Sequence, residues 1–307
     1  MADSIPYFIV DVFAEERYAG NQLAVFIDLE NRLNGIQMLA ITREINFAES
    51  AFIRSRESDN TFAVRIFTPE YEVPFAGHPS LGSAYICAKH LMTVVKGEIV
   101  LRLKEGAINI QIGTPQNLET SRFTMQQAQP CFGTTFTANE ITLGLHLPLD
   151  AVDSSMPIQE ISTGLPYIII FVKDLKTIQQ LQLSEQTVLE FLIGNKMYKN
   201  ISASALTTSL FFVTSETLVA DSDYHARMFA LENGKIVEDA ATGSANGCLL
   251  AYLLKYSGKL QFARVEQGFE MGRNSVLYLD GAFEKNEYRI NIGGQVVPIS
   301  EGTWFVS

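Results

Sequence analysis

Two stretches of this sequence repeat one pattern. Residues 65–91 read RIFTPEYEVPFAGHPSLGSAYICAKHL, and residues 227–254 read RMFALENGKIVEDAATGSANGCLLAYLL. Each stretch begins with Arg-x-Phe and then reaches a polar residue followed by x-x-x-Gly-Ser-Ala. That polar residue is His78 in the first copy and Asp239 in the second. The spacing from the arginine to the polar residue is 13 in one copy and 12 in the other, so the chain contains an internal duplication.

The two copies lie far apart along the chain. The offset from His78 to Asp239 is 161 residues, about half of the 307 in the chain, which is too long for the repeat of a solenoid. It predicts two homologous halves that face each other across a pseudo-twofold axis, each with its own core. We place their boundary in the polar stretch 116–133. We expect an N-terminal half of residues 1–125 and a C-terminal half of residues 126–307, whose last strand crosses back to the first half in one alternative.

Most of the expected secondary structure is strand, because short runs rich in β-branched and aromatic residues recur in both halves. Besides residues 31–45 and 177–195, the clearest helices follow His78 and Asp239. Pro79 suits the first helical position, and Asp239 is a strong N-cap residue. Both helices are apolar on all sides. We therefore expect them to be buried, one in each half of an α/β (α+β) fold.

The composition excludes several classes of protein. Hydrophobic residues make up 47% of the chain and charged residues 19%, as in a folded protein rather than a disordered one. The formal net charge of −11 argues against a nucleic-acid partner, which needs a basic surface. No run of 18 apolar residues indicates a membrane partner, and the first residues lack the pattern of a secretion signal. Since the three cysteines form no disulfide framework, we expect a cytoplasmic protein.

The starts of the two central helices suggest a site for an anion. The first turn of a helix carries unpaired N–H groups and a partial positive charge. Glycine at Gly77, Gly82 and Gly243 leaves these groups open, and the N–H groups near Gly77 and Gly243 would hold a small carboxylated substrate in a shared cleft. A nucleotide is not indicated, because the lysine of a phosphate-binding loop is absent after Gly82 and no Gly-x-Gly-x-x-Gly follows an early strand.

Glu49, in the segment NFAESAF, is the candidate acid/base. In a strand, Phe47, Glu49, Ala51 and Ile53 would share one face, so the carboxyl group would lie in an apolar row. Burial there would raise the pKa of Glu49 toward neutrality, where a carboxyl group can both give and take a proton. The alternative is that Glu49 marks the solvent side of an edge strand.

Three further residues have both a functional and a structural interpretation. His78 and Asp239 hold equivalent places in the two copies, so both are candidates to assist catalysis. Alternatively, Asp239 is only a helix cap, and His78 is a hydrogen-bonded structural histidine. Ser244 either donates a hydrogen bond to the substrate or bonds the backbone of its own helix.

The cysteines and the other histidines are assigned no chemistry. Cys87 and Cys248 lie nine residues beyond His78 and Asp239, roughly 13 Å along a helix at 1.5 Å per residue. We therefore favour buried packing over a racemase with two thiols. No His, Cys, Asp or Glu residues have the spacing of metal ligands. The unassigned histidines lie at a helix end, in a polar loop and before a strand: His90, His146 and His225.

Together, five segments resemble the PhzF-like family, which contains the phenazine-biosynthesis isomerases and their relatives. The segments are RIFTPEYEVPFAGHPSLGSA, NFAESAF, STGLP, VEDAATGSANG and QGFEMGR. The resemblance extends from the first strand to the last. It implies a fold similar to that of diaminopimelate epimerase, in which two pseudo-symmetric halves each form a curled mixed β-sheet wrapped around a central helix, with the active site between them.

The resemblance also implies the chemistry, which is the movement of a proton on a small carboxylated substrate by an isomerase that uses no cofactor and no metal. The acid/base glutamate of the family falls on Glu49 and its cleft histidine on His78. Its aspartate and serine fall on Asp239 and Ser244. No cysteine lies near either helix start, so the two-thiol racemisation of the diaminopimelate epimerase-like enzymes is not implied.

The sequence departs from the family pattern at two positions. Ala240 stands where the family usually has proline, and Ser80 where it usually has threonine. Neither change removes a reactive group, but the loss of the proline would relax the start of the second helix, and a phenazine pathway is not implied. The resemblance predicts a homodimer. The alternative function is a non-catalytic protein that binds a small carboxylate in the same cleft.

Overall fold

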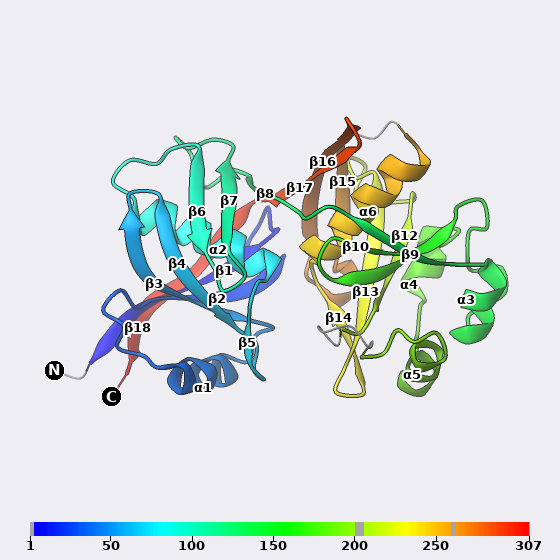
Figure 1. Ribbon diagram of the computed structural model, residues 1–307, viewed down its shortest axis with the longest axis horizontal. Helices are drawn as coiled ribbons and strands as arrows, with labels where there is room; N and C mark the ends of the chain where they lie inside the picture. The colour runs from blue at the N-terminus through cyan, green and yellow to red at the C-terminus, as the bar shows by residue number, and fades with distance from the viewer. Residues whose placement is uncertain (1–2, 200–205, 259–261, 307) are drawn as a thin grey trace. The chain divides into compact units, whose positions relative to one another are not determined.

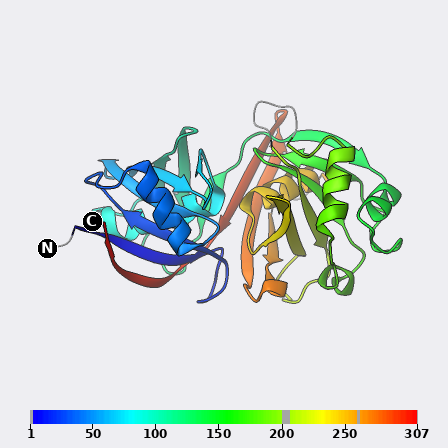
Figure 2. The ribbon, with the colours of Figure 1, turned by 90° about the horizontal axis from the view of Figure 1, so that it is seen from below.

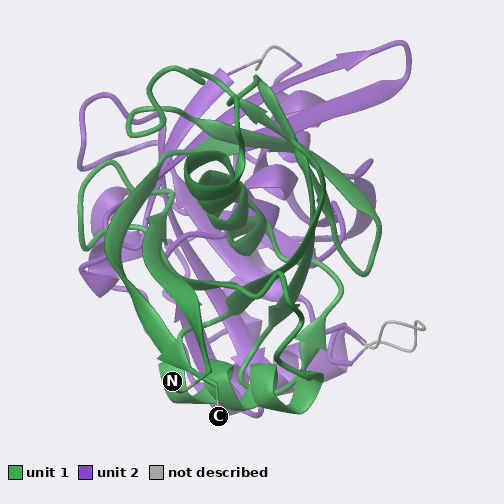
Figure 3. Ribbon diagram, turned by 90° about the vertical axis from the view of Figure 1, so that its left-hand side faces the viewer, with its two compact units in different colours: residues 1–126, 293–307 green, residues 127–292 purple. Residues whose placement is uncertain are grey.

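The computed structural model describes residues 3–199, 206–258 and 262–306. The chain divides into two compact units (Figure 1 and Figure 3). Unit 1 comprises residues 1–126 and 293–307, and unit 2 comprises residues 127–292. The chain therefore leaves unit 1 after strand β8 and returns to it for its last strand.

Unit 1 is built mainly from strands. Its elements are β1 (Ser4–Val12), β2 (Asn21–Ile27), α1 (Gly35–Ile45), β3 (Ser50–Ser58), β4 (Thr61–Phe67), β5 (Glu72–Val73), α2 (Gly77–Ile86), a π-helical turn (Cys87–Leu91), β6 (Glu98–Arg102), β7 (Ala107–Ile112), β8 (Phe123–Gln126) and β18 (Val296–Phe305). The returning strand β18 pairs antiparallel with β1 along its whole length, from Ser4 opposite Phe305 to Val12 opposite Val296.

Unit 2 has the same character. Its elements are β9 (Cys131–Phe136), α3 (Ala138–Gly144), β10 (Ile158–Ser162), β11 (Pro166–Phe171), α4 (Leu175–Gln179), α5 (Glu185–Gly194), β12 (Ser209–Thr214), β13 (Tyr224–Glu232), β14 (Lys235–Asp239), α6 (Gly243–Tyr256), β15 (Phe262–Gln267), the 3-10 helix η2 (Phe269–Met271) and β16 (Ser275–Glu284). Strand β17 (Glu287–Gly294) begins in this unit and ends in unit 1.

The two units repeat one order of strand pairing. In unit 1, β1 pairs antiparallel with β2, β2 parallel with β3, and β3 antiparallel with β4. Strand β4 then pairs antiparallel with β5 and parallel with β6, which pairs antiparallel with β7. Strands β10 to β16 of unit 2 repeat these pairings in the same sequence. The internal duplication of the sequence is therefore a duplication of topology.

Each unit buries one helix of the duplicated pattern. In α2 every residue from His78 to Ile86 is buried, and in α6 all residues from Ala245 to Leu254 are buried. The strands of unit 1 wrap around α2 (Figure 3), whereas α1 lies outside them (Figure 2). This is the predicted architecture, a mixed sheet curled around a central helix in each half.

The two central helices begin at different points of the repeated pattern. Helix α6 begins at Gly243, but α2 begins at Gly77, so the equivalent Gly82 lies more than one turn inside α2. Two predicted details are therefore wrong. Pro79 is the third residue of α2 instead of the first. Asp239 is the last residue of β14 and not an N-cap, because Thr242 holds that position.

The other predicted helices are partly correct. The segment 31–45 forms α1, which starts at Gly35 because Asn34 and Gln37 form a capping box. The segment 177–195 is interrupted, since α4 ends at Gln179 and α5 starts at Glu185. The apolar spacing continues through residues 180–184, so the spacing alone does not show the break between the two helices.

Candidate functional site

Glu49 lies directly before β3 and not within it. Helix α1 ends at Ile45, its C-cap Asn46 turns the chain with a left-handed backbone, and β3 begins at Ser50. The expected face of alternating residues is therefore wrong for Phe47 and Glu49, which precede the strand. The side chain of Glu49 is nevertheless only 19% exposed. The turn between α1 and β3 thus places a carboxyl group against the core.

His78 is the residue that faces this carboxyl group. Its Nε2 lies 3.5 Å from Oε2 of Glu49, and His78 is 7% exposed. Burial lowers the pKa of His78 to about 3, although a hydrogen bond with the backbone of Gln22 acts in the opposite direction. The imidazole is therefore neutral near pH 7. The contact is a neutral histidine beside a carboxyl group and not an ion pair.

The backbone contact of His78 fixes its tautomer. Since Nε2 has no hydrogen-bond partner within the described part of the chain, the bond to Gln22 comes from Nδ1. A hydrogen bond that favours the charged imidazole goes to the carbonyl oxygen, so Nδ1 carries the proton. The lone pair of Nε2 is then directed toward Glu49, and a proton on Glu49 would be shared between the two groups.

Glycines hold Gln22 and α2 in place. Gly20 has a φ of +65°, and a Cβ atom there would lie 2.4 Å from the carbonyl oxygen of Val12, so the turn into β2 requires glycine. A Cβ atom on Gly82 would lie 2.5 Å from Cδ2 of Leu23. Close packing of α2 on β1 and β2 therefore brings His78 to the backbone of Gln22.

Asp239, the counterpart of His78 in the sequence pattern, is the last residue of β14 in unit 2 and precedes the turn into α6. Its Oδ2 accepts a hydrogen bond of 2.6 Å from Oγ1 of Thr242. Gln267, in the segment QGFEMGR, donates from Nε2 to the backbone carbonyl of Asp239 at 2.8 Å and to Oγ1 of Thr242 at 2.9 Å. The carboxylate of Asp239 is thus part of a hydrogen-bonded turn that also includes the side chains of Thr242 and Gln267.

Ser244 is the second residue of α6, and its hydroxyl lies 2.7 Å from the hydroxyl of Tyr167 on β11. The side chain therefore has a partner outside its own helix. Either hydroxyl can donate in this contact. Tyr167 was not identified from the sequence, since nothing in the STGLPY segment marks it as the partner of a residue 77 positions away.

Gly77 and Gly243 are the first residues of α2 and α6. The N-cap side chains of α2 and α6 make no cap hydrogen bond, and neither does that of α5, whereas those of α1, α3 and α4 do. The first-turn N–H groups of α2 and α6 are thus not capped by their own N-cap side chains, which suits the binding of an anion.

An arginine–glutamate pair supports the duplicated hairpin in each unit. Arg65 on β4 makes two hydrogen bonds of 2.7 Å to Glu72 on β5. Arg227 on β13 makes two of 2.8 Å to Glu238 on β14. The Arg-x-Phe motif also places each guanidinium over a ring, that of Phe67 or Phe229. The motif that revealed the duplication therefore has a structural task in both copies.

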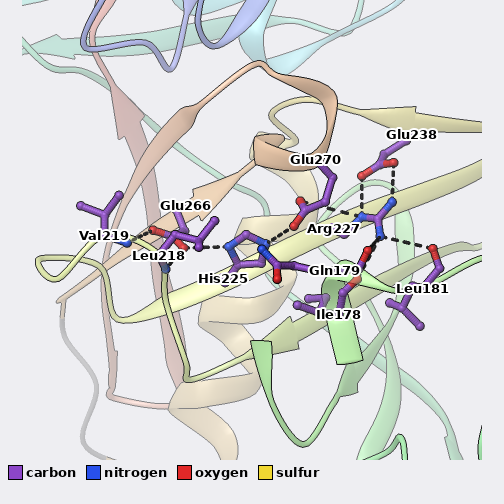
Figure 4. A network of polar contacts seen from close by, with 10 residues as sticks. All are labelled: Ile178, Gln179, Leu181, Leu218, Val219, His225, Arg227, Glu238, Glu266 and Glu270. Carbon is purple, nitrogen blue, oxygen red and sulfur yellow. Dashed lines mark hydrogen bonds and ion pairs between the residues drawn. The ribbon is translucent and has the colours of Figure 1, made fainter. Parts of the chain in front are cut away.

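A buried network of charges in unit 2 was missed by sequence reasoning (Figure 4). His225 lies within β13 and not before a strand, and it is fully buried. Its Nδ1 lies 2.7 Å from Oε1 of Glu266, and its Nε2 lies 3.0 Å from Oε1 of Glu270. Burial lowers the pKa of His225, but the two glutamates outweigh burial and raise it to about 9. His225 is therefore an imidazolium near pH 7.

Cys87 and Cys248 behave as packing residues, whereas His90 and His146 are exposed. Cys87 and Cys248 are fully buried, and burial raises the pKa of Cys248 to about 12. His90 lies in the π-helical turn, and His146 follows α3.

Over residues 3–199, 206–258 and 262–306, no group of three or more His, Cys, Asp or Glu is placed to hold a metal ion. Across those same ranges, no helix has the length and apolar character that crossing a membrane requires.

The described site residues fall into two groups. Unit 1 brings together Glu49, His78 and Gly77, and unit 2 brings together Asp239, Gly243 and Ser244. The sequence indicated these residues as candidates. It gave no indication of the backbone of Gln22 or of the hydroxyl of Thr242, because both are local supports whose residue types occur at many other positions.

Comparison with known proteins places this chain in a family. The family model of phenazine biosynthesis-like proteins, PhzC-PhzF, matches residues 10–302. The trans-2,3-dihydro-3-hydroxyanthranilate isomerase of Pseudomonas fluorescens is 30% identical over 301 residues, which cover 97% of this chain and 98% of that one.

Two solved structures show the same fold. The phenazine biosynthesis protein of the PhzF family from Bacillus anthracis is 25% identical with a TM-score of 0.83, over 98% of this chain and 99% of that one. A probable proline racemase from Agrobacterium radiobacter K84 is 10% identical with a TM-score of 0.61, over 97% and 92% of the two chains. The second likeness extends the fold beyond the PhzF family.

Proposed function

Because the chain belongs to the PhzC-PhzF family and is one of its isomerases, we propose that Glu49 moves a proton on a small carboxylated substrate. The observation that carries the proposal is the buried contact of 3.5 Å between Oε2 of Glu49 and Nε2 of a neutral His78. Two lone pairs that face each other repel, so this geometry favours a proton between them. Glu49 is thereby suited to hold a proton and to release it.

The reaction that we propose leaves the enzyme unchanged. The carboxylate of Glu49 removes a proton from one carbon of the substrate, and the electron pair of the broken C–H bond shifts into the neighbouring π system. The carboxylic acid of Glu49 then returns the proton to a different carbon, so no atom or electron is gained or lost. A distance of 3.5 Å between Glu49 and His78 is long for a hydrogen bond, but such contacts commonly shorten when substrate binds.

Residues of unit 2 would hold the substrate. We propose that the first-turn N–H groups of α6 at Gly243 and the hydroxyl of Ser244 bind its carboxylate, and that those at Gly77 assist in unit 1. Asp239 would orient the reacting end by a hydrogen bond. No cofactor takes part in the proposed steps. The family resemblance also supports a homodimer, which light scattering on the purified protein tests.

The substitution Glu49→Gln tests the proposal. It keeps the shape of the side chain but removes its acid/base group, so turnover is expected to fall by at least about 100-fold. The first substrate to assay is trans-2,3-dihydro-3-hydroxyanthranilate, the compound named for the relative from Pseudomonas fluorescens, followed by other cyclic and amino-acid-like carboxylates. Glu44→Gln is the matched control, because Glu44 is exposed on α1 in the same unit.

Thermal shifts on addition of the same carboxylates distinguish loss of binding from loss of chemistry. Because a ligand stabilises any fold that binds it, the Glu49→Gln variant should keep the shift seen in the parent protein. A variant that turns over substrate as fast as the parent would exclude Glu49 as the acid/base. A parent that binds but never turns over would instead favour the alternative function, a protein that only binds a carboxylate.

A further inference from the structure

The carboxylate of Asp239 is held by a hydroxyl whose direction is fixed. The hydroxyl of Thr242 donates to Oδ2 of Asp239 at 2.6 Å, and the same oxygen accepts a hydrogen bond from Nε2 of Gln267 at 2.9 Å. A hydroxyl has one proton. Since the amide of Gln267 can only donate at this contact, the proton of Thr242 is left for Asp239.

Gln267 uses its whole amide group on this turn. Besides Thr242 Oγ1, its Nε2 donates to the backbone carbonyl of Asp239 at 2.8 Å. Its Oε1 accepts from the backbone N–H of Thr242 at 3.3 Å and from Nδ2 of Asn246 at 3.1 Å. The residue is 0% exposed. An amide with four such contacts has a fixed orientation, so Gln267 ties the end of β14 to the first turn of α6.

Two neighbouring features hold Gln267 itself. Gly268 has a φ of +78°, and a Cβ atom there would lie 2.5 Å from the carbonyl oxygen of Ala240, so the two backbones meet where only glycine fits. On either side of this pair, Glu266 and Glu270 are both bonded to the imidazolium of His225 (Figure 4). The segment from Glu266 to Glu270 is therefore braced at both ends around Gln267.

We propose that Gln267 is a positioning residue that acts through the Thr242 hydroxyl to hold the carboxylate of Asp239 in its reactive orientation. This inference rests on the proposed function, because it requires Asp239 to act on the substrate. It assigns a task to the segment QGFEMGR, which the proposed function leaves without one.

Three substitutions test the inference. Thr242→Val removes the hydroxyl at constant shape. Gln267→Glu replaces the donor by an acceptor, which turns the proton of Thr242 away from Asp239 and adds a like charge beside it. Both are expected to lower kcat on trans-2,3-dihydro-3-hydroxyanthranilate by about 10- to 100-fold, with a smaller effect on KM. Thr242→Ser keeps the hydroxyl and should restore kcat to within about threefold of the parent.

The controls separate positioning from general damage. Gln159→Glu is the matched control, because Gln159 is a buried glutamine of the same unit that bonds Lys255 and Tyr256 instead of a site residue. It should leave kcat unchanged. A readout independent of substrate is the titration of the Asp239 side-chain carbon by NMR. Loss of the Thr242 hydrogen bond destabilises the ionised carboxylate, so its pKa should rise in Thr242→Val and not in Thr242→Ser.

The Asp239→Asn variant distinguishes failure of this inference from failure of the proposed function. If Asp239→Asn is inactive while folded Thr242→Val keeps the kcat and the Asp239 titration of the parent, the inference is overturned and the proposed function stands. If Asp239→Asn turns over substrate like the parent, the inference is overturned together with the proposed role of Asp239, whereas proton transfer by Glu49 is decided separately by Glu49→Gln. Should Gln267→Glu fail to fold, Thr242→Val alone decides, since its shape is unchanged.

Discussion

At the scale of single residues, the site in unit 1 depends on a histidine that carries no charge. His78 could be identified from the sequence because histidine is an unusual residue at a helix start, and Glu49 because it stands among apolar residues. Their contact could not be predicted in detail. The contact of His78 with Glu49 depends on a hydrogen bond from His78 to the backbone carbonyl of Gln22. Because every residue has a backbone carbonyl, the residue type at position 22 does not reveal this partner.

The neutral state of His78 gives stability a pH dependence of known sign. The unfolded chain binds a proton on this histidine below about 6.5, but the folded protein does so only below about 3. Between these values the unfolded state binds more protons, so stability falls as the pH is lowered. Between pH 6.5 and 5 the expected loss is roughly 1.5 to 2 kcal/mol.

Urea unfolding at the two pH values checks this expectation in the parent protein and in a His78→Gln variant. Glutamine keeps a donor for the carbonyl of Gln22 but does not titrate. The variant should therefore lack this part of the loss. Equal losses in both proteins would contradict a depressed pKa for His78.

At the scale of elements, buried ion pairs hold the strands that carry the site. His225 on β13 joins Glu266 on β15 to Glu270 in η2 (Figure 4). Arg227 joins β13 to Glu238 on β14 and to the carbonyl oxygen of Ile178. The sequence could not reveal this network, because charged residues at strand positions usually mark a solvated face. Only the fold shows that these charges are enclosed together.

The His225 network predicts a loss of stability at alkaline pH. The pKa of His225 is about 9 in the folded protein against an ordinary value of 6.5, so its contribution is complete below about 6.5 and disappears as the pH rises through 9. From pH 7 to 9.5 the expected loss is roughly 2 kcal/mol. Denaturant unfolding of the parent and of His225→Gln measures it. The variant should be less stable at pH 7 and should lack this slope, whereas an unchanged slope would exclude His225 as its source.

The position of α2 depends on close contact at one glycine. A Cβ atom on Gly82 would lie 2.5 Å from Leu23 and 3.0 Å from Val12, and overpacking of this kind costs about 1 to 3 kcal/mol. We expect Gly82→Ala to lower the thermal midpoint accordingly and to reduce turnover, because His78 moves with α2. Gly194→Ala is the matched control, since Gly194 is an exposed helical glycine whose Cβ would meet nothing within 4 Å. Equal midpoints for the two variants would rule out this account of the packing.

The central helices could be predicted from the sequence, but their first residues could not. The repeated Gly-Ser-Ala predicted equivalent helices, and both are present and buried. Their first residues differ. In unit 2 the chain stays extended up to Thr242 and α6 begins at Gly243, whereas in unit 1 helix α2 begins at Gly77, five residues before the equivalent Gly82. Capping preferences favoured Asp239, but its side chain bonds Thr242 within a turn instead. Capping preference therefore predicted approximately where α6 starts, but tertiary contacts determine that Thr242 and not Asp239 is the N-cap residue.

At the scale of the whole molecule, the duplication is the feature that the sequence revealed most completely. The same order of parallel and antiparallel pairings occurs in both units, and the Arg-x-Phe motif supports a hairpin in each. The return of the last strand to unit 1, which the sequence predicted as one alternative, is observed for residues 293–307. The sequence left that alternative open, because pairing of β18 with β1 depends on backbone hydrogen bonds, which residue types specify only weakly.

The chemistry of the two units is unequal although their topology is repeated. Unit 1 places the carboxyl group of Glu49 beside the neutral His78, and unit 2 contains the hydrogen-bonded carboxylate of Asp239 and the hydroxyl pair of Tyr167 and Ser244. A duplicated fold with different side chains at equivalent places suits a reaction whose two proton positions are different. This asymmetry favours an isomerase with one acid/base group over a racemase with two matched groups.

Turnover in D2O, with mass spectrometry of the product, tests the transfer of a proton by this chain most directly. If the proton that Glu49 has taken from the substrate exchanges with D2O before Glu49 protonates the second carbon, product formed by the parent protein carries one deuterium on that carbon. The Glu49→Gln variant, incubated alongside at equal concentration, should form neither product nor labelled substrate. Deuterium incorporation by Glu49→Gln at the rate of the parent would contradict the assignment of Glu49 as the group that carries the proton.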